Sequence, residues 1–179
     1  MLTSQLPNAE GQTPLVLSSA DGHIEICRLL VQAGADVDAR DNNGRTPLWN
    51  ASCFGQLDVV LYLIGEKADI NSADSRDRTP LWNASYLGHL DVVRYLIGQK
   101  ADINSTDNHG RTLLCNASYF GHLDIVRYLI NKKADINSTD NRGWSPLQLA
   151  WSQSHRDVVV LLLDHGAVFV LRNADENIP

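Results

Sequence analysis

Apolar segments alternate along the chain with polar segments that carry Asn, Asp and Gly, and the alternation keeps a fixed spacing. Residues 90–97 (LDVVRYLI) place apolar side chains on more than one face, which is typical of a helix packed between neighbours. An earlier segment starts at Thr79-Pro80, where the hydroxyl caps free backbone N–H groups and Pro is tolerated in the first turn. Residues 102–111 are polar and suit a hairpin-like turn. The pattern therefore predicts two short helices followed by a turn.

Glycine and acidic residues mark the boundary between the two predicted helices. The first helix is expected to run for about nine residues and to end near a glycine that can adopt the left-handed conformation. The second helix opens with an acid in its first turn, which suits the positive end of the helix dipole. The glycines are Gly22, Gly55, Gly88 and Gly121, and the acids are Glu25, Asp58, Asp91, Asp124 and Asp157.

The whole unit recurs at intervals of 33 residues. Thr13-Pro14-Leu15 returns as Thr46-Pro47-Leu48, and residues 79–111 share 25 of 33 positions with residues 112–144. Because neither helix of one unit can bury its apolar face alone, the units are expected to stack into a solenoid. We predict a single domain covering residues 1–179, with a tail at 173–179 and five repeats at about 8–40, 41–73, 74–106, 107–139 and 140–172.

A unit of this length with Thr-Pro-Leu, a Gly-His, a Val-Val helix and an Ala-Asp-Ile-Asn turn resembles the ankyrin repeat. The resemblance covers residues 8 to about 172. It implies an all-α ankyrin-repeat solenoid, built from helix-turn-helix units with hairpin-like connecting turns. It also implies recognition of protein partners through a concave face and the hairpin tips.

Two kinds of turn position depart from the glycine of that family. Lys67, Lys100 and Lys133 stand where the family has the Gly that ends the second helix. If the backbone there is left-handed, each Lys costs about 1 kcal/mol relative to Gly. Asp77 stands at a turn position that is Gly in the neighbouring repeats, an exchange that Asp accepts in a turn.

The position after Thr-Pro-Leu also departs from the family. Trp49, Trp82, Cys115 and Gln148 occupy the place of its usual His, so the hydrogen bonds of that His are absent. Trp151 stands where the family prefers Ala, which predicts different packing in the last repeat.

Composition narrows the class of protein. The net charge is −6 with no block of like charges, which argues against a nucleic-acid partner because such binding leaves a basic footprint. No apolar stretch is long enough to insert into a membrane, and the N-terminus lacks the basic start and apolar run of a signal peptide. Cys27, Cys53 and Cys115 are odd in number and far apart, so we expect reduced thiols in a cytoplasmic or nuclear, intracellular protein.

No catalytic, metal or cofactor site is distinguishable from the repeat background. His23, His89, His122 and His155 recur at the repeat period, but no acid or thiol recurs beside them at ligand spacing. No Ser/His/Asp or Cys/His constellation and no Gly-rich phosphate loop is present in the sequence. We therefore expect no enzymatic activity, no metal and no cofactor.

Three asparagines carry a separate hypothesis. Asn71, Asn104 and Asn137 each follow a Leu by eight residues within the Ala-Asp-Ile-Asn turn. In ankyrin proteins this arrangement resembles the target of an asparaginyl hydroxylase, while a turn-stabilising role is sufficient by itself. Asn104 and Asn137 also lie in Asn-x-Thr sequons, but the family buries this Asn against the turn backbone, which favours a structural role over glycosylation.

The predicted partner surface combines aromatic residues at the ends of the first helices with arginines at the hairpin tips. Large aromatics and Arg are the residues that dominate binding hot spots. The acids are expected mostly elsewhere, so the partner is predicted to be an acidic protein or peptide segment with apolar anchors. The alternative is that Tyr86 and Tyr119 only fill the gap between successive first helices. The predicted residues are Arg45, Phe54, Arg76, Arg78, Tyr86, Leu87, Arg111, Tyr119, Phe120, Arg142 and Trp144.

The main functional hypothesis is a protein–protein interaction module, a scaffold or adaptor. The alternatives are a structural spacer array, or a fragment of a larger ankyrin-repeat protein without its own groove ligand. Val160 and Leu161 replace the more polar Arg and Tyr of the preceding repeats, which predicts self-association through the C-terminal repeat.

Overall fold

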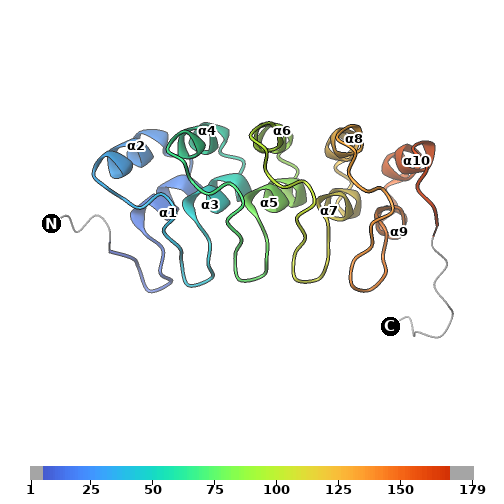
Figure 1. Ribbon diagram of the computed structural model, residues 1–179, viewed down its shortest axis with the longest axis horizontal. Helices are drawn as coiled ribbons and strands as arrows, with labels where there is room; N and C mark the ends of the chain where they lie inside the picture. Colours follow the sequence, from blue (N-terminus) through green and yellow to red (C-terminus); the bar gives the residue numbers. More distant parts are fainter. Residues whose placement is uncertain (1–5, 170–179) are drawn as a thin grey trace.

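The computed structural model describes residues 6–169, which form two rows of short helices with a row of hairpins below them (Figure 1). Five helices next to the hairpins form the first row, and five helices above them form the second row. First-row helices are α1 (Pro14–Ala20), α3 (Pro47–Cys53), α5 (Pro80–Leu87), α7 (Leu113–Tyr119) and α9 (Pro146–Ser152). Second-row helices are α2 (Ile24–Gln32), α4 (Leu57–Gly65), α6 (Leu90–Gly98), α8 (Leu123–Asn131) and α10 (Arg156–Asp164).

The first-row helices begin as the sequence predicts but are shorter. In each, a Thr or Ser side chain accepts a hydrogen bond from the backbone N–H three residues later, as between Thr79 and Trp82 at 3.1 Å. Four of these helices have seven residues and α5 has eight, instead of the expected nine. In the first four repeats the helix stops before the glycine because that residue already has a positive φ, 70° at Gly55 and 87° at Gly88. Ser154, with a φ of 61°, takes this position after α9.

The core lies between the two rows and runs through the whole stack. Val92, Val93 and Leu96 of α6 are fully buried, and their counterparts in α4 and α8 are buried equally. The predicted acid is present in the first turn of every second-row helix, although these helices have no side-chain cap. Each helix contacts the next helix of its own row, so every repeat completes the core of its neighbour.

In the second to fifth repeats, the hairpin is held by a buried or half-buried aspartate at the start of its turn. The exposed Asn8 takes this place in the first repeat. The Oδ1 of Asp74 accepts the N–H groups of Arg76 and Arg78 at 2.9 and 3.0 Å, and Asp41, Asp107 and Asp140 act in the same way. Successive turns are joined by a backbone bond, such as Asn108 N–H to the Arg76 carbonyl at 3.0 Å. The hairpins therefore form one continuous edge.

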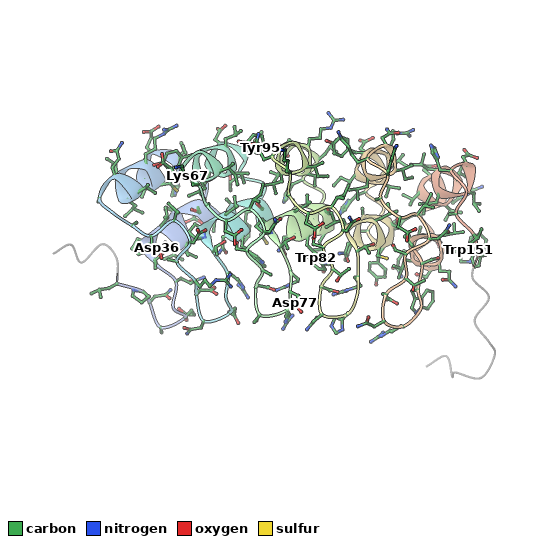
Figure 2. All side chains as sticks on the ribbon, viewed as in Figure 1. Asp36, Lys67, Asp77, Trp82, Tyr95 and Trp151 are labelled. Carbon is green, nitrogen blue, oxygen red and sulfur yellow. The ribbon has the colours of Figure 1, made fainter. Side chains whose placement is uncertain are left out.

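The left-handed positions expected from the sequence are confirmed. Lys67, Lys100 and Lys133 have φ values of 67°, 67° and 64°, and Asp77 has a φ of 61°. Asp77 lies in the turn of its hairpin (Figure 2). The side chains at these positions must therefore occupy a conformation that Gly adopts without strain.

Apolar side chains are exposed at both ends of the described stack. At the C-terminal end, Val160 is 56% exposed, and Trp151 is 64% exposed with its ring 5.8 Å from that of Phe169. The different packing predicted for the last repeat is thus confirmed at Trp151, which lies at the outer edge of the last repeat (Figure 2). The predicted tail at 173–179 lies outside the described residues.

Candidate functional site

The surface formed by the hairpins and the adjoining ends of the first-row helices is hereafter called the hairpin face. It brings together residues from every described repeat, and it has two hollows. The first hollow, of about 370 Å³, lies mainly between the second and third repeats and includes Arg45, Phe54 and Arg76. The second hollow, of about 560 Å³, lies between the fourth and fifth repeats and includes Tyr119 and Trp144.

The tryptophans that replace the family's His form the floor of the hairpin face. Trp49 donates its indole N–H to the carbonyl of Arg78 at 3.0 Å, and Trp82 donates to the carbonyl of Arg111 at 3.1 Å. Each bond joins one repeat to the next, so the indoles replace the lost His bonds with bonds of their own. Trp82 lies beside the hairpin edge (Figure 2).

Arginines and tryptophans alternate along this floor. The guanidinium of Arg78 lies over the rings of both Trp49 and Trp82, at 5.4 and 5.7 Å from the ring centroids. The guanidiniums of Arg45 and Arg111 lie over Trp49 and Trp82, at 5.1 and 5.5 Å. Such contacts contribute about 0.5–2 kcal/mol each and fix the arginine stems against the rings. Sequence reasoning missed these tryptophans as part of the site, although the four-residue spacing of Arg and Trp repeats twice.

Two of the predicted arginines are already paired within the protein. Arg78 binds Oδ2 of Asp74 through Nε and Nη2, at 2.9 and 2.5 Å, and the Asp74 side chain is 0% exposed. Arg111 binds Asp107 in the same two-pronged way, at 2.8 and 2.6 Å. These pairs cancel charge at a hairpin edge that the sequence predicts to be basic and largely free of acids. The expectation that the acids lie mostly elsewhere is wrong at the hairpins, because the turn requires an aspartate beside each arginine.

The predicted placement of the arginines at the hairpin tips is also wrong in part. The turns run from each aspartate to the residue three later, so Arg76 and Arg142 are turn residues and both are exposed. Arg45, Arg78, Arg111 and Trp144 follow the turns, on the arm that returns to the helix, and are half-buried.

The aromatic residues fall into a packed group and an exposed group. Tyr86 is half-buried, stacked on Trp82 at 5.1 Å and in edge contact with Phe120 at 4.5 Å. Phe54, at 56%, and Tyr119, at 38%, are exposed and line the first and second hollows respectively. Tyr86 therefore fills a gap between first-row helices, while the other two are accessible. Leu87 and Phe120 are exposed as well.

The second hollow exists where two repeats differ from the pattern. Cys115 takes the place of a tryptophan and Trp144 that of an arginine, and both line this hollow. The smaller thiol leaves space over α7 that an indole fills elsewhere. Burial raises the pKa of the Cys115 thiol above its ordinary value, although hydrogen bonds from Thr112 oppose the shift. In the first hollow, burial raises the pKa of Cys53, and Arg45 and Arg78 oppose it.

The asparagines of the hydroxylation hypothesis are exposed, in contrast to the expected burial of Asn104 and Asn137. Oδ1 of Asn71 accepts the backbone N–H of Asp102 at 3.0 Å, and Oδ1 of Asn137 accepts that of Val168 at 3.0 Å. The side chains of Asn71 and Asn137 lie at the surface because they reach across to the next repeat rather than into their own turn. Their modification stays a prediction.

The periodic histidines link repeats instead of facing one another. Nε2 of His89, His122 and His155 lies 3.0 Å from a carbonyl oxygen in the last turn of a first-row helix. In each case that helix belongs to the preceding repeat. Across residues 6–169, no group of three or more His, Cys, Asp or Glu side chains is arranged to hold a metal ion. None of the helices in the same range is long and apolar enough to cross a membrane.

Comparison with known families gives one match. A family model described as ankyrin repeats (3 copies) matches residues 2–74 and again residues 81–173, which together span most of the chain. No curated protein matches the chain.

Proposed function

This chain belongs to the ankyrin repeat family, and from that premise we propose that it binds a segment of another protein on the hairpin face. Ankyrin repeats are generally protein-interaction modules, and this chain presents an exposed face with two hollows. The single observation that carries the proposal is the pair of accessible aromatics, Phe54 and Tyr119, each at the rim of a hollow. Exposed aromatics beside polar groups are typical anchors of binding hot spots.

The chemistry of the face indicates the kind of segment that fits. Arg76 is exposed at the first hollow and Arg142 at the second. The two aspartates that could oppose a ligand's acid, Asp74 and Asp107, are already neutralised by ion pairs within the protein. An extended segment with acidic residues and two large apolar side chains complements this arrangement. Charge is expected to govern the association rate, and the apolar anchors the dissociation rate.

The test is capture of partners by the immobilised chain, repeated with Phe54→Ser and Tyr119→Ser together. A matched control is Leu61→Ser, because Leu61 is an exposed apolar residue of α4 in the second row. We expect the double variant to lose partners that the control retains. If a partner confirmed by direct binding is retained equally by both variants, the hairpin face is not its site.

A second proposal concerns the apolar ends of the stack. We infer that the last repeat of one copy of the chain packs against the first repeat of another copy. Between repeats, Arg28 lies over the ring of Tyr62 and Arg94 over that of Tyr128. At the ends, Val160 stands at the position of these arginines and Leu29 at the position of the tyrosines, and both are exposed. Stacking one copy on the next would then place an apolar residue on an apolar residue.

Sedimentation of the chain over a range of concentrations tests this second proposal. We expect reversible association that Val160→Arg abolishes, because the substitution restores the arginine found at the equivalent positions 94 and 127. A monomer at every concentration would overturn it.

A further inference from the structure

Arg45 differs from its counterparts in the third and fourth repeats. Arg78 and Arg111 each hold the aspartate four residues earlier, but no ion pair joins Arg45 to Asp41 in the described structure. The Nε atom of Arg45 and the Oδ2 atom of Asp41 are both buried without a hydrogen-bond partner. A buried donor without an acceptor is unfavourable. Because the protein covers Nε, a ligand can reach Arg45 only through the part of its side chain that lines the first hollow.

The position of Arg45 is set by the indole beneath it. Its guanidinium lies 5.1 Å from the ring centroid of Trp49, and Trp49 is itself held by its bond to the Arg78 carbonyl. Trp49 is buried, so the indole ring on which Arg45 lies is held in place by the surrounding protein. Less side-chain freedom is therefore lost when the planar guanidinium meets a ligand.

The first hollow provides a positive field around this arginine. Arg45, Arg76 and Arg78 line it, and none of its lining residues is acidic. Phe54 lies at the same hollow and is exposed, so an apolar side chain has a surface to pack on beside the charge. The second hollow differs, because Asp140 lines it and weakens attraction for an anion.

We propose that Arg45 is the anchor for an Asp or Glu side chain of the partner, with an apolar neighbour of that residue packed on Phe54. The inference rests on the proposed function, since it names the acid-binding position within the hairpin face. The carboxylate would accept from the two terminal nitrogens of Arg45, because Nε is covered, whereas Asp74 binds Nε and Nη2 of Arg78. Arg78 and Arg111 then stabilise their hairpins through Asp74 and Asp107, and Arg45 binds the ligand.

The test uses a phage-displayed library of random dodecapeptides selected on the immobilised full chain. Selected peptides are synthesised, and their affinities are measured for the wild type, Arg45→Met and Arg28→Met. Arg28 is the matched control, because its guanidinium also lies over an aromatic ring, that of Tyr62, but in the second row. We expect an acidic residue next to a large apolar residue in the selected peptides. Arg45→Met should weaken their binding about tenfold, and Arg28→Met should leave it unchanged.

Three further measurements keep the outcome clear. Thermal unfolding shows whether Arg45→Met is folded at the assay temperature, and Arg45→Lys supplies the charge without the planar fork. Arg45→Lys is expected to recover only part of the affinity, because an ammonium cannot make the two-pronged contact. Added salt should weaken wild-type binding more than Arg45→Met binding.

The results separate this inference from the proposed function. Peptides that lose affinity in Phe54→Ser and Tyr119→Ser but not in Arg45→Met overturn the role of Arg45 alone. Selected peptides without acidic residues do the same. Peptides insensitive to all of these substitutions, or a selection that yields no binder, overturn both.

Discussion

Nε2 of His122 lies 3.0 Å from the carbonyl oxygen of Tyr86, which is 36 residues earlier and in the preceding repeat. Because the acceptor is a carbonyl, this nitrogen carries the proton and donates it. The second repeat has Gln56 at the equivalent position, and its Nε2 donates to the Ala20 carbonyl at 3.1 Å. Different side chains thus satisfy the same carbonyl at successive helix ends.

This relationship predicts how the position tolerates substitution. His122→Ala should lower the free energy of unfolding by about 1 kcal/mol, because the carbonyl at the end of α5 loses its partner. His122→Gln should lose much less, since Gln makes this bond at position 56. Urea unfolding of both variants measures the difference, and equal losses would contradict the role given to the hydrogen bond.

The ion pair between half-buried Arg78 and buried Asp74 predicts a different response from two neighbouring arginines. Arg78→Met leaves the carboxylate of Asp74 buried without its cation, which should lower the free energy of unfolding by about 3 kcal/mol. Arg76→Met changes an exposed turn residue and should cost less than about 0.5 kcal/mol. Comparable losses in chemical unfolding would show that the Arg78 pair is not structural.

Backbone strain predicts that glycine stabilises the lysine turns. Lys100 has a φ of 67°, so Lys100→Gly should raise the free energy of unfolding by up to about 1 kcal/mol, less the greater entropy of the unfolded chain. Replacing a glycine that has a positive φ by alanine is the reverse change, and it offers a control. Gly143→Ala meets only the strain of its φ of 75°, because no atom lies within 4 Å of the added Cβ. Gly55→Ala places its Cβ 2.5 Å from Nδ1 of His89 and should cost more. The order of the three thermal midpoints checks the argument.

The buried thiol of Cys115 predicts a loss of stability in alkali. Burial raises its pKa in the folded protein, while the unfolded chain releases the proton near pH 8.5. The folded state therefore binds more protons at high pH, and the free energy of unfolding falls as the pH rises above about 8.5. Cys115→Ala should show a shallower alkaline decline than the wild type. Identical slopes would mean that this thiol does not contribute.

Nearest-neighbour packing predicts that a whole repeat can be removed. Deletion of residues 79–111 joins Arg78 to Thr112, which keeps the 33-residue register and the order of cap, helix and hairpin. The product should be folded and helical, with a lower midpoint of thermal unfolding. Circular dichroism measures both properties. Loss of the helical signal would indicate that the repeats depend on contacts beyond their neighbours.

The sequence by itself determined the repeat, the two helices of each unit and the conformation of its turns. Thr79 caps α5, Gly88 ends it, and Lys100 and Asp77 adopt left-handed backbones, all as the residue pattern predicts. These features depend on interactions within a few residues, so short-range signals are sufficient for them. The 33-residue spacing then determined the stack, because each unit presents the same apolar faces to its neighbour.

The tertiary structure decided which side chains of the predicted site are accessible. From the sequence, Arg45, Arg78 and Arg111 are equivalent, as are Tyr86 and Tyr119. In the fold, Arg78 is bound by a buried aspartate and flanked by two indoles from successive repeats, whereas Arg45 has no ion pair. Tyr86 packs on Trp82 and Phe120, while Tyr119 borders the space left by Cys115. The outcome at each position depends on residues one repeat away, whose side-chain directions only the packed structure defines.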